Sequence, residues 1–230
     1  MFGPDPIDWF DPSPYGSLAF YGHIAIGILA LAAAFLAFAV RKGSVLHRRS
    51  GLVYMAACAF VCATSIAMLV QAMIPPLAMA VFTSIYAIGG AYLALRSGTR
   101  RVLLGEKSLF ALELAAFGFF MAMAIPAIVQ GFIPFYAPFV IAIIPVILLA
   151  GDVRWLRNPE KRKQWRIARH LSRMIWGFVV VVRAPLVELA AGGYLPRYQM
   201  LFVVGPIVAG VAMVWYFQRK FGGTPFGKAS

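Results

Sequence analysis

The chain contains seven long runs of mostly apolar residues, and these runs constrain its fold more than any other feature. A helix of about 20 apolar residues is long enough to cross the hydrocarbon core of a bilayer. The runs that meet this length occupy residues 17–40, 51–74, 77–95, 108–130, 133–150, 171–191 and 199–218. The sequence therefore predicts an all-α integral membrane protein with seven transmembrane helices.

The composition excludes a water-soluble or disordered chain. Hydrophobic residues make up 62% of the sequence and charged residues 13%, whereas a soluble domain averages about 45–50% apolar and about 25% charged residues. Disordered segments have low hydrophobicity, which is the opposite of what this chain shows. The bilayer is therefore the expected partner of most of the surface.

Two pairs of spans are separated by only two residues each, namely Pro75-Pro76 and Gly131-Phe132. Read as one helix, each pair would contain about 45 residues and reach about 65 Å, which is twice the hydrocarbon thickness. Each pair is therefore expected to form a hairpin.

Basic residues mark one side of the predicted bundle. Segments 41–50, 96–107 and 151–173, together with the C-terminal tail, carry 19 of the 21 Lys and Arg residues. Lys and Arg concentrate in cytoplasmic loops. This bias predicts a multi-pass protein of the cell inner membrane, with residues 1–16 outside, 17–218 in the bilayer and 219–230 in the cytoplasm. The net charge of +13 then reflects this orientation and contact with anionic lipid headgroups, not binding to nucleic acid.

The outer turns resemble one another. Residues 70–78 (VQAMIPPLA) align without gaps on residues 129–137 (VQGFIPFYA), and a third turn at 187–196 follows with a two-residue insertion. This similarity favours one helix followed by three parallel hairpin repeats, an arrangement found in transporters. The alternative is that proline simply ends helices at this interface.

Ionisable side chains inside apolar spans are costly and by default indicate function. Arg183 lies about 18 Å along its span from the basic side, too deep for an interface anchor. We expect an intramembrane polar pocket in which Arg183 holds an anion. The polar residues expected around it are His23, Glu113, Glu188, Gln71 and Gln130. The alternative is that Arg183 extends toward the interface and the glutamines cap helix ends.

Two histidines suggest a second site. His47 and His170 each stand at the cytoplasmic start of a span. Two such imidazoles could be axial ligands of a b-type haem, and the neighbouring arginines would suit its propionates. These arginines are Arg48, Arg49, Arg169 and Arg173. The alternative is a basic rim at the lipid headgroups. No metal site or complete catalytic set is evident, so the chain is not expected to be an enzyme.

The two cysteines, Cys58 and Cys62, belong to a stripe of small and polar residues at helical spacing. Such residues let helix backbones approach closely. Packing is therefore the expected role of this stripe.

The same segments resemble an uncharacterised bacterial family of predicted multi-spanning membrane proteins, a domain of unknown function. The resemblance rests on H-R-x-x-G-x-x-Y, here from His47 to Tyr54, and on H-x-x-x-M-I, here from His170 to Ile175. Trp176 stands where the family tends to have a second basic residue. The resemblance implies that His23, His47, His170 and Arg183 act together, and it implies no particular activity.

Three functions follow from these observations. The first is binding or transport of a small ligand around Arg183, a ligand that is anionic if the guanidinium holds it directly. The second is a membrane redox protein that holds haem or a quinone at His47 and His170. The third is a non-catalytic subunit that assembles with other membrane proteins, since no complete catalytic set accompanies the spans.

Overall fold

The computed structural model describes residues 17–71, 73–96, 98–191 and 196–221. This part of the chain contains seven α-helices, two short 3₁₀ helices and no strand. The α-helices are α1 (Ser17–Ala39), α2 (Val45–Gln71), α3 (Pro75–Ala94), α4 (Arg100–Val129), α5 (Ala137–Arg157), α6 (Arg162–Ala191) and α7 (Gln199–Phe221). All seven are long and apolar enough to cross a membrane. The predicted fold class is confirmed, while segment 1–16 and residues 222–230 of the tail lie outside the described residues.

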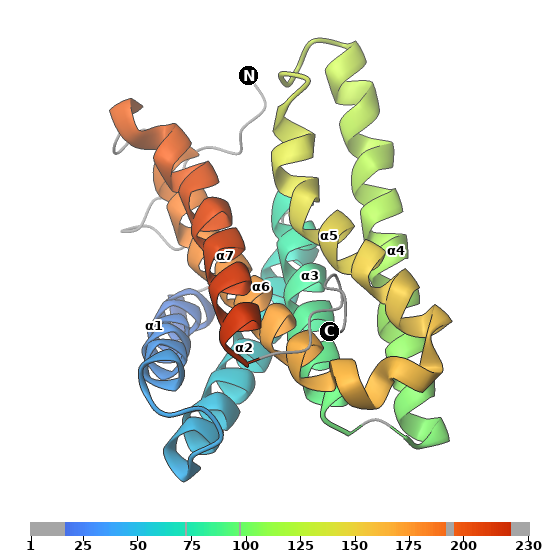
Figure 1. The fold of residues 1–230 in the computed structure, drawn as a ribbon. Helices are drawn as coiled ribbons and strands as arrows, with labels where there is room; N and C mark the ends of the chain where they lie inside the picture. Colours follow the sequence, from blue (N-terminus) through green and yellow to red (C-terminus); the bar gives the residue numbers. More distant parts are fainter. Residues whose placement is uncertain (1–16, 72, 97, 192–195, 222–230) are drawn as a thin grey trace.

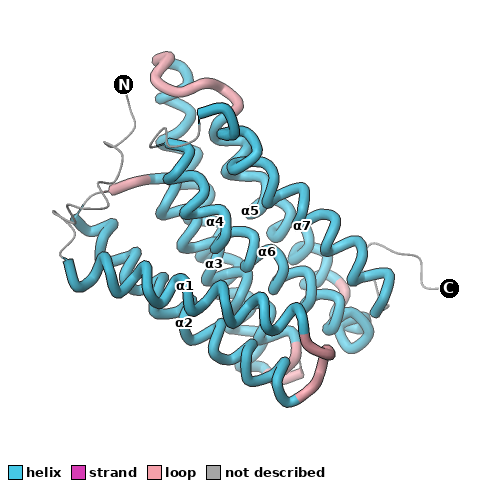
Figure 2. The backbone as a smooth tube through the Cα atoms, turned by 90° about the vertical axis from the view of Figure 1, so that its left-hand side faces the viewer, coloured by secondary structure: helices cyan, strands magenta, loops and turns pink. Residues whose placement is uncertain are grey.

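Helix α3 forms the centre of the bundle. It packs against α2, α4, α5 and α6, while α1 packs along α2 and α7 along α6. Figure 1 shows α1 and α2 on one side of the molecule and α4 and α5 on the other, and Figure 2 shows α1 and α2 running together along their length. The expected hairpins are present, and their relation as sequence repeats stays a prediction.

Close approach of the central helices depends on glycine. A Cβ atom at Gly177 of α6 would lie 2.9 Å from Ile88 of α3, and one at Gly210 of α7 would lie 2.7 Å from Val179 of α6. A side chain does not fit at such distances. These glycines therefore let the backbone of α6 pack against side chains of α3, and the backbone of α7 against side chains of α6.

Helices extend past the predicted spans where the Lys- and Arg-rich segments lie. We call this the basic end of the bundle, at which α1, α3, α5 and α7 end. Segments 41–50, 96–107 and 151–173 were expected as loops, but most of their residues belong to α2, α4, α5 and α6. Hydropathy marks only the length of a helix that contacts lipid. The helical backbone hydrogen bonds continue beyond this length, because charged side chains at the basic end pair with residues of other helices.

Candidate functional site

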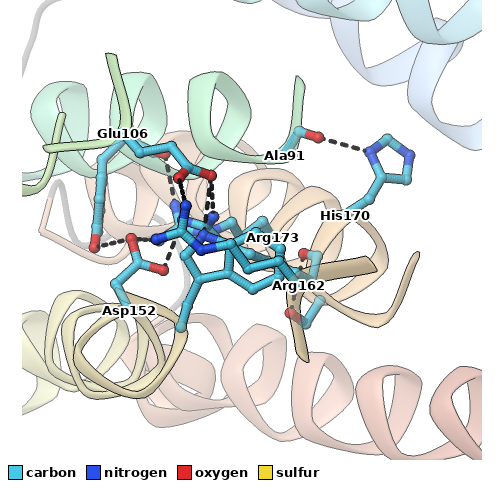
Figure 3. A network of polar contacts seen from close by, with 10 residues as sticks. Ala91, Glu106, Asp152, Arg162, His170 and Arg173 are labelled. Atoms are coloured by element: carbon cyan, nitrogen blue, oxygen red, sulfur yellow. Dashed lines mark hydrogen bonds and ion pairs between the residues drawn. The ribbon is translucent and has the colours of Figure 1, made fainter. Parts of the chain in front are cut away.

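A buried ion-pair cluster joins α4, α5 and α6 near the basic end (Figure 3). Arg169 of α6 pairs with two acids. Its Nη1 donates to Glu106 of α4, and its Nη2 donates to Asp152 Oδ1 of α5 at 2.8 Å. Arg173 pairs with the other oxygen of Asp152. These four side chains, which we call the charge cluster, are all buried. The two carboxylates and two guanidinium groups of these four side chains balance in charge, and Arg162 adds a third guanidinium at the edge, 3.6 Å from Glu106 Oε2.

Aromatic residues complete the partners of the charge cluster. The Tyr86 hydroxyl donates to Asp152 Oδ2 at 2.7 Å, and the Tyr86 carbonyl accepts from Arg173 at 2.8 Å. Trp155 Nε1 donates to Glu106 at 3.0 Å. The guanidinium groups also lie over these rings, Arg169 over Trp155 at 4.4 Å and Arg173 over Tyr86 at 4.3 Å. Four helices, α3 to α6, are therefore fastened together here.

Glycine makes room for this arrangement on α3. A Cβ atom at Gly90 would overlap the guanidinium of Arg173. Gly90 lies one turn from Tyr86 on the same face of α3, since residues three or four apart are neighbours on a helix surface. The buried arginine therefore packs directly against the α3 backbone.

The charge cluster changes the interpretation of the predicted propionate partners. Arg173 was expected to hold an anionic cofactor, but Asp152 and the Tyr86 carbonyl already bond its guanidinium. Arg169 is likewise engaged by two carboxylates. Arg48 and Arg49 are exposed. The cluster thus has the character of a structural clamp, with its charges matched within the protein.

A cavity of about 290 Å³ occupies the half of the bundle nearer the opposite end. Residues of α1, α2, α3, α5 and α6 line it, and most of the lining is apolar. The polar side chains in its wall are His23, Ser65, Thr83, Ser84 and Arg183, together with the thiols Cys58 and Cys62. The structure therefore places Arg183 and His23 in the wall of one cavity, while their role in binding a ligand stays a prediction.

Among the described residues, Arg183 is the one arginine that lines this cavity, and its side chain is only 8% exposed. Its Nε donates to the carbonyl of Val203 on α7 at 3.0 Å. No other group among the described residues bonds it, so both terminal amino groups are left to the cavity. Arg183 is thus buried among the described helices, and its role as the holder of an anion stays a prediction.

Two prolines add acceptors to the cavity wall. Pro145 of α5 and Pro185 of α6 lie within helices and line the cavity. Proline has no N–H, so the carbonyl four residues earlier loses its helical donor. Those carbonyls belong to Ile141 and Val181, which also line the cavity. Two residues of the wall therefore have a backbone carbonyl without its usual helical donor.

Glu113 of α4 lies behind the cavity wall. It is fully buried, and its Oε1 accepts a hydrogen bond from the Thr83 hydroxyl at 2.8 Å. Oε2 has no hydrogen-bond partner within the described part of the chain. Because Thr83 lines the cavity, Glu113 is one hydrogen bond away from it.

The other predicted pocket residues are placed differently. Gln71 and Gln130 are exposed at the ends of α2 and α4 and do not line the cavity. The side chain of Glu188 lies outside the described residues. His23 bonds Thr64 of α2 through Nδ1 at 2.9 Å, which fixes its ring between α1 and α2.

His47 and His170, near the basic end, are each held by a backbone carbonyl. His47 Nδ1 bonds the Ala37 carbonyl at 3.1 Å, and His170 Nδ1 bonds the Ala91 carbonyl at 3.0 Å. A carbonyl only accepts, so Nδ1 carries the proton and Nε2 is the remaining nitrogen of each ring. His170 lies eight residues inside α6 and not at a loop edge as expected. No group of three or more His, Cys, Asp or Glu in the described ranges could hold a metal, and the shared-haem hypothesis stays a prediction.

Glu106 and Asp152 are not among the predicted site residues, although the sequence contains a signal for them. Glu106 and Glu113 are seven residues apart on α4, and Arg162, Arg169 and Arg173 follow the same helical spacing on α6. Residues at these intervals share one face of a helix. If both segments are read as helices, one has acids along one face and the other has arginines along one face. This pattern predicts that the two faces contact each other.

Comparison with known proteins finds no relative of this chain. No family model, no curated protein and no solved structure matches the chain. The resemblance to a family of multi-spanning bacterial proteins therefore stays a prediction, and the function has to be inferred from the cavity and the residues around it.

Proposed function

We propose that the protein binds a small, mostly apolar molecule with an anionic head group in the cavity beside Arg183. The observation that carries this proposal is the guanidinium of Arg183, buried in the cavity wall with two amino groups that no described residue bonds. A charged side chain in the membrane interior is costly unless it is paired. A bound anion would supply the missing partner.

The chemistry of the wall supports this class of ligand. A guanidinium binds a carboxylate or phosphate through two parallel hydrogen bonds. The apolar remainder of the lining suits a hydrocarbon or aromatic body. The volume, about 290 Å³, is just below the range of about 300–1,000 Å³ that is usual for small-molecule sites. The ligand is therefore expected to be no larger than a few fused rings or a medium-length chain.

We further propose that the basic end faces the cytoplasm of a bacterial inner membrane, since 19 of 21 Lys and Arg residues are in the segments at that end and in the tail. Leu104 is exposed on α4 at this end. In a variant whose native cysteines are replaced, Leu104→Cys should react with an impermeant thiol reagent only after the cells are opened. Reaction in intact cells would reverse the orientation.

The two native thiols test occupancy of the cavity directly. Cys58 and Cys62 are the chain's two cysteines, and both line the cavity. We expect 2-naphthoate to slow their modification by methyl methanethiosulfonate in nanodiscs, as measured by intact mass. The cationic analogue 2-naphthylmethylammonium has the same ring system and should protect far less. Equal protection by the two compounds, or none by either, would contradict the proposal.

A further inference from the structure

A few residues in the cavity wall are also exposed on the outside of the bundle. Most of the described residues that line the cavity are buried or half-buried, whereas Ile28 of α1, Pro76 of α3 and Pro185 of α6 are exposed. The wall of a closed cavity is covered on its outer side. Exposed lining residues therefore mark the places where the cavity meets the surface.

Ile28 and Pro185 lie at the same depth, on the two sides of the gap between α1 and α6. Nearer the basic end this gap is closed by Phe35 and Phe178, whose rings meet edge to face with centroids 5.2 Å apart. Ile28 is seven positions from Phe35, and Pro185 is seven positions from Phe178, both away from the basic end. Seven positions are about two turns, or about 10 Å, along the same face of a helix. The gap that the rings close is therefore open two turns further along.

This opening lies at the level of the hydrocarbon core. Ile28 is halfway between Ser17 and Ala39, the two ends of α1, and the middle of a membrane-spanning helix lies near the centre of the bilayer. The Ile28 side chain is 63% exposed. Gly27 beside it also lines the cavity, and a Cβ atom there would meet no atom within 4 Å. Open space beside the middle of α1 therefore adjoins the cavity.

We infer that the ligand is an amphiphile dissolved in the membrane, which enters the cavity from the side, through the opening between Ile28 and Pro185. This inference rests on the proposed function. Both residues are apolar, so a molecule that passes between them has to be soluble in hydrocarbon, since a hydrated inorganic ion would lose its water without replacement. Arg183 lies two residues before Pro185 and lines the same cavity. An acidic head group that passes the opening therefore reaches the guanidinium.

Pro76 marks the route that competes with this one. It lies in the first turn of α3, at the end of the bundle opposite the basic end, where a path from water would begin. Cys58 and Cys62 report on both routes, because they line the cavity. Benzyl methanethiosulfonate dissolves in the bilayer, whereas sulfonatoethyl methanethiosulfonate is an anion that stays in water. With each rate divided by that of the same reagent with free cysteine, the benzyl reagent should modify the protein in nanodiscs much faster.

Tryptophan substitutions locate the route of the benzyl reagent. Gly27→Trp places a large ring beside the opening and should slow the modification by about tenfold or more, because a filled gap in a close-packed protein leaves no path. Gly22→Trp is the matched control. Gly22 also has open space around its Cβ position but does not line the cavity, so its rate should equal that of the wild type. Intact mass measures the modification.

A second pair of variants serves if Gly27→Trp does not fold. Ile28→Trp narrows the same opening from an exposed position and should also slow the benzyl reagent. Leu29→Trp is its control, since Leu29 is exposed but does not line the cavity.

The possible failures are distinct. Equal rates in each variant and its control, or a sulfonatoethyl reagent as fast as the benzyl reagent, would overturn the lateral route. The proposed function survives that result if 2-naphthoate binds the wild type and Arg183→Leu weakens the binding. If 2-naphthoate does not bind the wild type, the proposed function fails, and the amphiphile inferred here fails with it, even where the thiol rates depend on the opening.

Discussion

Replacing Asp152 by leucine is expected to lower the free energy of unfolding by about 3–5 kcal/mol, the usual cost of breaking a buried ion pair by removing one partner. Asp152 accepts from Arg169 and pairs with Arg173, and both arginines are buried. Without the carboxylate, the Tyr86 carbonyl is the remaining hydrogen-bond acceptor of Arg173 among the described residues, and Glu106 is that of Arg169. Unfolding by a denaturing detergent in mixed micelles measures the effect.

Glu160→Leu provides the control, because Glu160 is an exposed acid in the short helix between α5 and α6. Its replacement should change the free energy of unfolding by no more than about 0.5 kcal/mol. The double variant Asp152→Leu with Arg173→Leu should lose less than the sum of the two single variants, because neither charge is then left alone. An Asp152→Leu variant as stable as Glu160→Leu would show that the charge cluster does not hold the helices together.

Arg183→Leu is expected to weaken binding of 2-naphthoate about 10- to 150-fold, which corresponds to about 1.5–3 kcal/mol for hydrogen bonds to a charged group. The leucine keeps an apolar side chain in the wall, so the cavity itself should persist. Calorimetry in nanodiscs measures the affinity. The neutral analogue 2-naphthamide should bind wild type and Arg183→Leu with affinities that differ by only a few fold.

Arg197→Leu is the matched control for this loss. Arg197 lies near the same end of the bundle, is exposed and does not line the cavity. Its removal should leave the affinity for 2-naphthoate unchanged in high salt, where the interactions of exposed charges are screened. If Arg183→Leu and Arg197→Leu behave alike, Arg183 contributes no specific contact to the anion.

The membrane spans could be predicted from the sequence because each depends only on the residues of its own segment. Each apolar run is long enough to cross the bilayer by itself, and all seven appear as helices. The helix bounds at the basic end could not be predicted in this way. There, α5 continues to Arg157 and α6 begins at Arg162, since pairing between distant side chains supports helix where hydropathy has ended.

The candidate site was predictable only in part, for the same reason. A single arginine within an apolar span indicates function by its cost alone, so Arg183 could be singled out without knowledge of its neighbours. The partners of Asp152 come from α3 and α6, and nothing in the local sequence around Asp152 names them. Gln71 and Gln130 matched each other in sequence, but a polar residue at a helix end has no energetic reason to face inward.

A crystal structure of the protein grown with 6-bromo-2-naphthoate tests the central claim most directly. The account predicts an anomalous bromine peak inside the cavity, with the carboxylate at about 2.7–3.2 Å from the terminal nitrogens of Arg183, the range of an ordinary hydrogen bond. An empty cavity at saturating ligand concentration, or a bromine peak elsewhere while Arg183 contacts only Val203, would contradict it.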